Sequence, residues 1–195
     1  MGNQVEIICK NNGKTLLVDE GTALIDIYKT AGVELPYQVL CAQVNNRTRD
    51  LSYRVYQPKQ IMFSDASHIM GMRMYVRSLC FVLYKAVTEL FPGTRLRIEH
   101  SVSNGYFCCL NQREEIPHDT VELLKERMRD IIRRDLPFER IQSTAEVAAG
   151  HFREQDMCDK IDLIETLHPL YATYYKLGNL YDVYYEYLLP STGYL

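Results

Sequence analysis

With 195 residues, of which 47% are hydrophobic, the chain is long enough for one full-sized domain or two small ones. Its net charge of -3 argues against a protein that coats nucleic acid through overall positive charge, but leaves a local basic face open. The sequence lacks the apolar run of about seven residues typical of a signal peptide and the run of about 18 typical of a membrane span. We therefore expect a cytoplasmic protein with no membrane partner, whose six cysteines are reduced.

The first 65 residues predict a small unit of strands around one helix. Residues 4–10 and 14–20 are rich in β-formers on either side of an Asn-Asn-Gly turn, which is typical of a hairpin. Residues 22–32 have apolar side chains at helical spacing and end in Gly32. Strands follow near 37–45 and at 60–64. This order of elements suggests a ubiquitin-like β-grasp.

The remaining residues, 66–195, predict an α+β unit in which helices pack on an antiparallel sheet. A long helix should run from His68 to Phe91, where Pro92 and Gly93 end it. Strands at 94–100 and 105–110 form a hairpin, and a second helix should begin at Pro117. The Ser143 to Glu146 pattern is a capping box that would begin a third helix. The tyrosine-rich tail predicts two strands around a turn at 176–179. The domain boundary should lie near 64–68.

Two motifs that resemble binding sites have plainer interpretations. Gly13, Lys14 and Thr15 match the end of a phosphate-binding loop, but Ile8 occupies the position of its first glycine and a strand follows, so we expect a simple hairpin. The five histidines are scattered, with no pair spaced to hold a metal from one helix. We expect no metal, with a zinc site assembled from distant parts as the alternative.

The densest basic stretch is residues 125–135. Arg127, Arg133 and Arg134 are candidates for contact with RNA, although alternating acidic residues also fit a solvated helix face. The tyrosines of the tail could stack on bases, but such a run more often covers a core.

Several ordered motifs resemble one known pair of modules. "AVTELFPGTRLRIEHSVSNGYF" at 86–107, "RMRDIIRRDLPFER" at 127–140, "DKIDLIETL" at 159–167 and "PSTGYL" at 190–195 are similar to the second additional domain of threonyl-tRNA synthetase, which edits mischarged tRNA. The first 65 or so residues resemble the TGS domain that precedes it. The resemblance implies a β-grasp TGS domain at 1–65 and an editing-like domain at 66–195.

The residues that carry editing in that family are replaced here. Its two helix histidines and its later cysteine and histidine align with Arg77, Phe81, Tyr184 and Leu188. Neither Phe81 nor Leu188 can bind metal or move protons, and Arg77 stays protonated. The family's lysine and aspartate persist as Lys160 and Asp182. These two could be relics, a structural ion pair or part of a new ligand site, and we favour the ion pair.

Our first functional hypothesis is a non-catalytic regulatory, ligand-binding or RNA-binding region. The same modules precede a P-loop kinase domain in bacterial proteins that resemble uridine kinase, and the chain's end at "PSTGYL" suggests such an N-terminal fragment. That setting implies a downstream kinase domain as partner, with ATP and Mg²⁺ bound there and no cofactor in this chain. The alternative is a tRNA-editing hydrolase with a site rebuilt from Lys160, Asp182, His100 or Cys108. A third hypothesis is RNA recognition alone.

Overall fold

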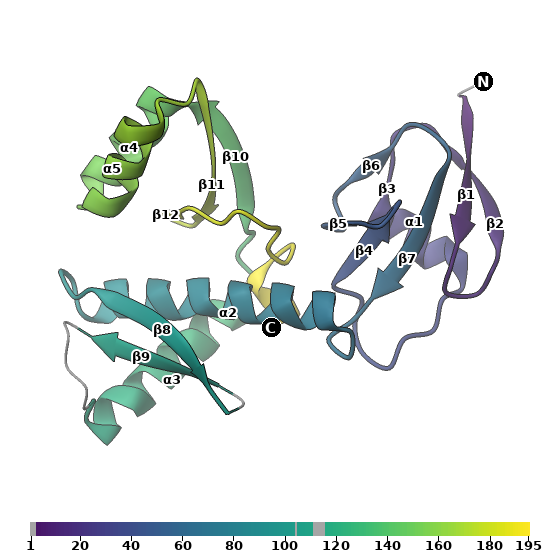
Figure 1. Ribbon diagram of the computed structural model, residues 1–195. Coiled ribbons are helices and arrows are strands. Elements are labelled where there is room, and N and C mark those ends of the chain that lie inside the picture. The colour runs from purple at the N-terminus through teal and green to yellow at the C-terminus, as the bar shows by residue number, and fades with distance from the viewer. Residues whose placement is uncertain (1–2, 104, 111–115) are drawn as a thin grey trace.

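The computed structural model describes residues 3–103, 105–110 and 116–195. Its first part is a five-stranded sheet in the order β2-β1-β7-β4-β5, in which β1 and β7 are parallel and the other neighbours antiparallel (Figure 1). The strands are β1 (Gln4–Cys9), β2 (Thr15–Asp19), β4 (Cys41–Val44), β5 (Arg47–Arg49) and β7 (Lys59–Ser64). A second, two-stranded pair joins β3 (Thr22–Ala23) to β6 (Arg54–Val55).

Side-chain alternation explains why one face of this sheet is covered. Along β1, Val5, Ile7 and Cys9 point into the core and their neighbours are exposed. Helix α1 (Leu24–Ala31) buries its apolar stripe against them and ends at Gly32, whose φ of 62° suits a residue without a Cβ. The predicted hairpin, helix and two later strands are confirmed. The short strands β5 and β6 were not predicted, and residues 22–23, expected to begin the helix, form β3 instead.

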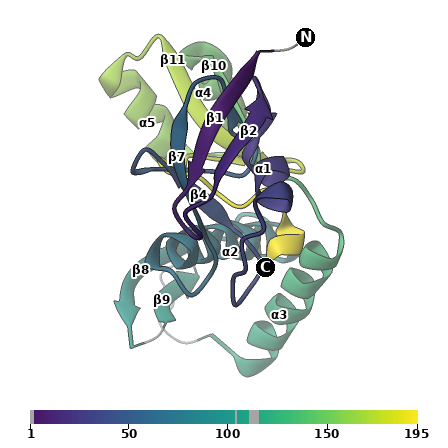
Figure 2. The ribbon, with the colours of Figure 1, turned by 90° about the vertical axis from the view of Figure 1, so that its right-hand side faces the viewer.

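The second part is organised around α2 (Ile69–Leu90), which lies between two antiparallel sheets (Figures 1 and 2). One sheet is the hairpin of β8 (Leu96–Val102) and β9 (Gly105–Leu110); the other joins β10 (Glu139–Thr144), β11 (Tyr171–Leu177) and β12 (Leu180–Asp182). The other helices are α3 (His118–Arg133), α4 (Ala145–Glu154), α5 (Cys158–Leu167) and the 3₁₀ turn η1 (Thr192–Tyr194). The molecule is therefore mixed α+β with antiparallel sheets.

Three apolar clusters form the core. The largest surrounds α2 and also takes in Leu40 and Cys41 from the N-terminal part; the second lies under α1, and the third joins α4 to Tyr174. Tyr194 packs against the first two clusters. Leu40, Cys41 and Tyr194 therefore link the N-terminal part to the cluster around α2.

The connection between β7 and α2 is tightly bonded. Asp65 is 1% exposed and accepts hydrogen bonds from the amides of Tyr37 and Ser67 and from the Ser67 hydroxyl. Burial alone would raise the pKa of Asp65, but these hydrogen bonds outweigh it and lower the pKa. A Cβ at Gly71 would lie 1.9 Å from the Asp65 carbonyl oxygen, so the first turn of α2 approaches this segment as only glycine allows.

Two sequence predictions need correction. The second part contains two antiparallel sheets on α2, where one was expected. The capping box is wrong: Thr144 is the N-cap of α4 and makes no side-chain cap, because Ser143 still belongs to β10 and its hydroxyl contacts Tyr174. The strand β10 and the helix α5 were not predicted. The predicted turn at 101–105 includes residue 104, which lies outside the described residues. No helix of the described chain is long and apolar enough to cross a membrane.

Candidate functional site

The structure brings together the four positions that the sequence analysis matched to the family's editing residues. Arg77 and Phe81 lie one turn apart on α2, and the segment after β12 carries Tyr184 and Leu188 across it. The rings of Phe81 and Tyr184 have centroids 5.2 Å apart. Arg77 Nη1 donates a hydrogen bond of 2.7 Å to the carbonyl of Tyr187, the residue before Leu188.

Two of these positions are now part of the core. Phe81 is 0% exposed and also faces the ring of Phe138, with centroids 6.1 Å apart. Leu188 is 1% exposed, and its amide donates to the Tyr175 hydroxyl at 3.3 Å. Neither side chain can hold a metal, activate water or transfer a proton.

Arg77 ties α2 to the segment that follows β12. Besides the Tyr187 carbonyl, its guanidinium contacts the Glu186 carboxylate as an ion pair. An arginine stays protonated at physiological pH, so Arg77 can bind an anion but cannot act as a base.

Lys160 and Asp182 form the predicted pair, with Nζ and Oδ1 3.7 Å apart, while Lys160 also lies 3.3 Å from Asp159. Burial raises the pKa of Asp182, and the Lys160 charge offsets this only in part. The Tyr184 side chain lies close to the Asp182 carboxylate, and burial raises the pKa of Tyr184 well above its usual range. Lys160, Asp182 and Tyr184 therefore form a polar cluster. Whether they bind a ligand stays a prediction.

We expect Asp182→Asn to keep or raise the stability of the protein at pH 7. The pKa of Asp182 is higher in the folded than in the unfolded protein, so Asp182 binds its proton more tightly in the folded protein. The free energy of unfolding of the wild type should therefore fall, relative to that of the variant, as the pH rises from the ordinary pKa of an aspartate, 3.8, through the raised pKa of Asp182 in the folded protein. Urea unfolding of both proteins between about pH 4 and pH 7 measures this difference. A marked loss of stability at pH 7 would instead show that the ion pair is net stabilising.

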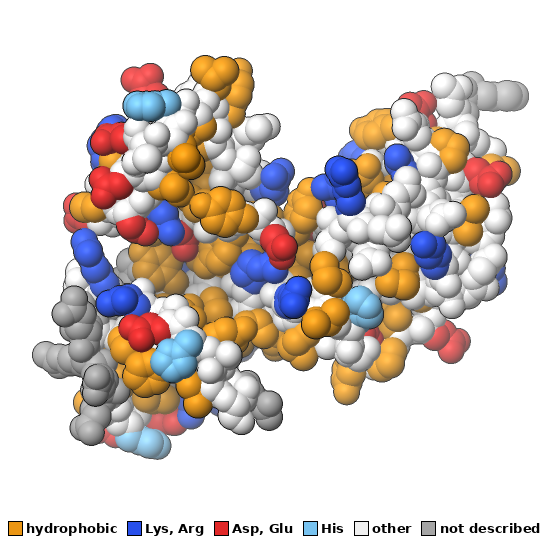
Figure 3. Space-filling model, in the orientation of Figure 1, with side chains coloured by type: hydrophobic (Ala, Val, Ile, Leu, Met, Phe, Trp, Pro, Cys, Tyr) orange, Lys and Arg blue, Asp and Glu red, His pale blue; other side chains and the backbone are white. Residues whose placement is uncertain are grey.

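A groove of about 660 Å³ adjoins these residues. Its polar lining includes Arg73, Arg77 and Tyr184. Its apolar lining includes Ile69, Met72, Val76, Cys80, Ile98 and Tyr106. With two arginines beside apolar side chains, the groove suits an anionic ligand that also has an apolar or aromatic portion. Figure 3 shows a separate hollow, between the N-terminal part and the rest of the molecule, with Lys and Arg side chains around it.

The other residues proposed for a rebuilt site lie on the β8–β9 hairpin. His100 stacks on Phe107, with ring centroids 5.5 Å apart, and the Cys108 thiol lies 3.7 Å from the Tyr106 carbonyl. Burial raises the pKa of Cys108, which favours the unreactive thiol. Within the described chain no hydrogen bond or ion pair joins either residue to Lys160 or Asp182. The described residues also contain no group of three or more His, Cys, Asp or Glu that could hold a metal ion.

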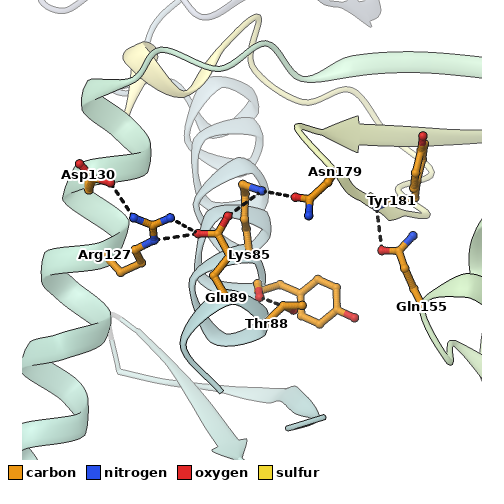
Figure 4. A network of polar contacts seen from close by, with 9 residues as sticks. Lys85, Thr88, Glu89, Arg127, Asp130, Gln155, Asn179 and Tyr181 are labelled. Carbon is orange, nitrogen blue, oxygen red and sulfur yellow. Dashed lines mark hydrogen bonds and ion pairs between the residues drawn. The ribbon is translucent and has the colours of Figure 1, made fainter. Parts of the chain in front are cut away.

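The basic residues of α3 differ in their surroundings. Arg127 is held by Glu89 at 2.7 Å and by Asp130 at 2.7 Å, whereas Arg133 and Arg134 are exposed (Figure 4). Arg127 therefore belongs to an internal ion network. Contact of Arg133 and Arg134 with RNA stays a prediction.

Two arrangements around the site were not predicted. Lys85 is 3% exposed, bonded to Glu89 at 3.0 Å and to Asn179 at 2.8 Å. Arg49 of β5 donates a 2.6 Å hydrogen bond to the Tyr187 hydroxyl, while the Arg140 guanidinium lies 5.3 Å from the same ring. The position of Lys85 on an apolar helix face, four residues before Glu89, was a local signal for their ion pair. The contact of Arg49 with Tyr187 joins residues 138 apart in sequence, and no local pattern indicates it.

No protein-family model matches the chain. It is 30% identical over 174 residues to the threonine–tRNA ligase of Desulforamulus reducens, a match that covers 89% of this chain and 27% of the relative. It is 29% identical over 182 residues to that of Rubrobacter xylanophilus, covering 93% of this chain and 28% of the relative. The match to the threonine–tRNA ligase of Caldanaerobacter subterraneus subsp. tengcongensis is 24% identical and covers 99% of this chain and 30% of the relative. The chain thus spans less than a third of the length of these relatives. Over most of its own length it is similar to threonine–tRNA ligases.

Proposed function

We propose that this chain is an RNA-binding region of the kind found in threonine–tRNA ligases, which accommodates the end of a tRNA without hydrolysing an aminoacyl ester. In this proposal residues 1–65 are a TGS-like β-grasp domain and residues 66–195 an editing-like domain. The β-grasp is supported by the parallel pairing of β1 and β7 within an otherwise antiparallel sheet, and by α1 on one face. The editing-like domain is supported by the similarity to threonine–tRNA ligases.

The observation that carries the proposal is the state of the four former editing positions. Phe81 and Leu188 are core residues, Arg77 forms an ion pair with Glu186, and burial raises the pKa of Tyr184. Hydrolysis of an ester needs a water activated by a metal or by a base of suitable pKa. These four side chains offer neither, whereas the adjacent groove has the size and the positive charge to receive a nucleotide.

The kinase setting gains no support from the relatives, which are threonine–tRNA ligases. We therefore base the proposed function on the resemblance to threonine–tRNA ligases. A downstream kinase domain with ATP and Mg²⁺ stays a prediction from sequence that nothing else supports.

We expect RNA binding to depend on salt through the exposed arginines at the end of α3. Each neutralised phosphate contributes a slope of about 0.7 to 0.9 when the logarithm of the affinity is plotted against that of the salt concentration. The double change Arg133→Gln with Arg134→Gln should therefore reduce the slope by about 1.5. Fluorescence anisotropy with a labelled tRNA at several salt concentrations measures it.

A control with the same loss of charge is Lys10→Gln with Lys29→Gln, at exposed residues of the N-terminal part. Its slope should stay close to that of the wild type. RNA that fails to bind the wild type at low salt, or a slope that changes equally in both variants, would contradict contact through α3.

The second candidate function is hydrolysis by a rebuilt site, which the Lys160, Asp182 and Tyr184 cluster favours. Burial raises the pKa of Asp182, which is the direction of shift that suits a carboxyl group to act as a general acid or base. A deacylation assay with mischarged tRNA separates the two functions. Our proposal expects no release of amino acid above the rate in buffer. Release that is lost in Lys160→Ala or Asp182→Ala would establish the hydrolase instead.

A further inference from the structure

Two arginines of α2 face the groove on successive turns. Arg73 and Arg77 are four residues apart and both line the groove. Arg73 is exposed and makes no ion pair or hydrogen bond with the described residues. Two guanidinium groups in a largely apolar groove attract an anion more strongly than they would in open solvent.

A carboxylate of the chain itself already occupies one of these guanidinium groups. Glu186 contacts Arg77 Nη2, while the Tyr187 carbonyl takes Nη1 at 2.7 Å. The Arg77 side chain is 23% exposed, but that of Glu186 is 66% exposed. The carboxylate therefore sits at the solvent side of the pair, where an incoming phosphate could displace it.

The segment that carries Glu186 is held in position from two sides. Arg49 of the N-terminal part donates to the Tyr187 hydroxyl at 2.6 Å, and its guanidinium also lies 5.1 Å from the ring of Tyr53. Arg140 of β10 lies against the ring of Tyr187. This anchoring keeps the Glu186 carboxylate next to Arg77 at a high effective concentration.

We propose that Glu186 is an internal competitor that regulates access of a phosphate group to Arg77 and Arg73 in the groove. The inference rests on the proposed function, because it takes the ligand to be the phosphate of a nucleotide at the end of an RNA. The ligand must displace Glu186 from Arg77 before both arginines can bind it. The free energy needed to displace Glu186 therefore lowers the affinity of the wild type for the phosphate group.

The test compares Glu186→Gln with the wild type for binding of adenosine 5′-monophosphate and of a short single-stranded RNA. Loss of the Glu186 charge frees Arg77, so both probes should bind about 5 to 20 times more tightly. The control is Glu165→Gln, which removes an equally exposed carboxylate from an ion pair with Arg153. The control changes the net charge by the same amount and should leave the affinity unchanged.

A double variant identifies the groove as the site. Combining Arg77→Gln with Glu186→Gln should remove most of the gain, while Arg134→Gln with Glu186→Gln should keep it for adenosine 5′-monophosphate. Equal affinity of wild type and Glu186→Gln for both probes, or a gain that persists without Arg77, would overturn the inference.

Failure of the inference and failure of the proposed function give different results. If the mononucleotide binds Glu186→Gln more tightly but RNA binds neither protein, the competitor role holds and the RNA function fails. If RNA binds the wild type with a strong salt dependence and Glu186→Gln changes nothing, the RNA function holds and the competitor role fails.

Discussion

Replacing Glu89 by leucine should lower the free energy of unfolding by about 3 to 5 kcal/mol, because it leaves a buried ammonium group without its carboxylate. Lys85 is 3% exposed and lies 3.0 Å from Glu89 Oε1, whereas Glu89 Oε2 contacts Arg127 at 2.7 Å (Figure 4). The other partner of Lys85 Nζ is the side-chain oxygen of Asn179, which is uncharged. Urea unfolding at pH 7 measures the loss.

Two further variants show that the loss comes from the unpaired charge. Glu122→Leu breaks an exposed pair with Lys125 and should change stability by no more than about 0.5 kcal/mol. Adding Lys85→Met to Glu89→Leu removes the unpaired ammonium and should restore much of the stability. A loss in Glu89→Leu no greater than in Glu122→Leu would mean that the network contributes little.

The effect of Glu89→Leu should also depend on pH. Burial alone would raise the pKa of Glu89, but the hydrogen bonds and charges of Lys85 and Arg127 outweigh it and lower the pKa. A carboxyl group whose pKa is lowered in the folded protein stabilises the fold at pH values above its ordinary pKa, which is 4.5 for Glu89. This contribution is lost as the pH falls through the lowered pKa. The difference in free energy of unfolding between wild type and Glu89→Leu should therefore become smaller in acid.

The network also has a bearing on the candidate site. Asn179 belongs to the turn between β11 and β12, and β12 ends at Asp182, two residues before Tyr184. Lys85 therefore fixes the start of the strand that carries the polar cluster. At Gly178 a Cβ would lie 3.2 Å from Lys85 Nζ, and its φ of 64° also favours glycine.

How much the sequence predicted depends on whether the signal was local. The Asn-Asn-Gly turn, the Gly32 stop and the apolar spacing of α2 act through neighbouring residues, and the elements they predict are confirmed. The Ser143 capping pattern failed because pairing of β10 with β11 competes for the same residues. Helix α5 has no buried residue, so its apolar periodicity is too weak to predict it.

The candidate site shows the same limit. The four positions were predicted from their distance to motifs that resemble those of a known family. What replaced their chemistry could not, because Arg77 meets Glu186 across 109 residues and Arg49 meets Tyr187 across 138. Such contacts are set by the packing of α2 between two sheets and against the N-terminal part, which has no signature in a short window of sequence.

Restoring a histidine at the second helix position should destabilise the protein and should not recreate a metal site. Phe81→His removes a ring that is 0% exposed and contacts Phe138 and Tyr184, and it places ring nitrogens in an apolar core. Truncation of such a packed ring to alanine costs about 3 to 5 kcal/mol. Histidine refills part of that space but buries polar nitrogens without a partner, so we expect a loss of similar size. Urea unfolding measures the loss, and titration with zinc should detect no binding.

The matched control is Tyr185→His, which introduces a histidine on the adjoining segment at a side chain that is 87% exposed. Its stability should stay within about 0.5 kcal/mol of the wild type. Phe81→Leu separates packing from polarity, because it keeps an apolar side chain in the core and should cost less than the histidine. If Phe81→His were as stable as the control, or bound zinc, this position would still be open to a metal site. A large loss without zinc binding would mean that the site has become part of the hydrophobic core, leaving the adjacent groove as the place where a ligand can bind.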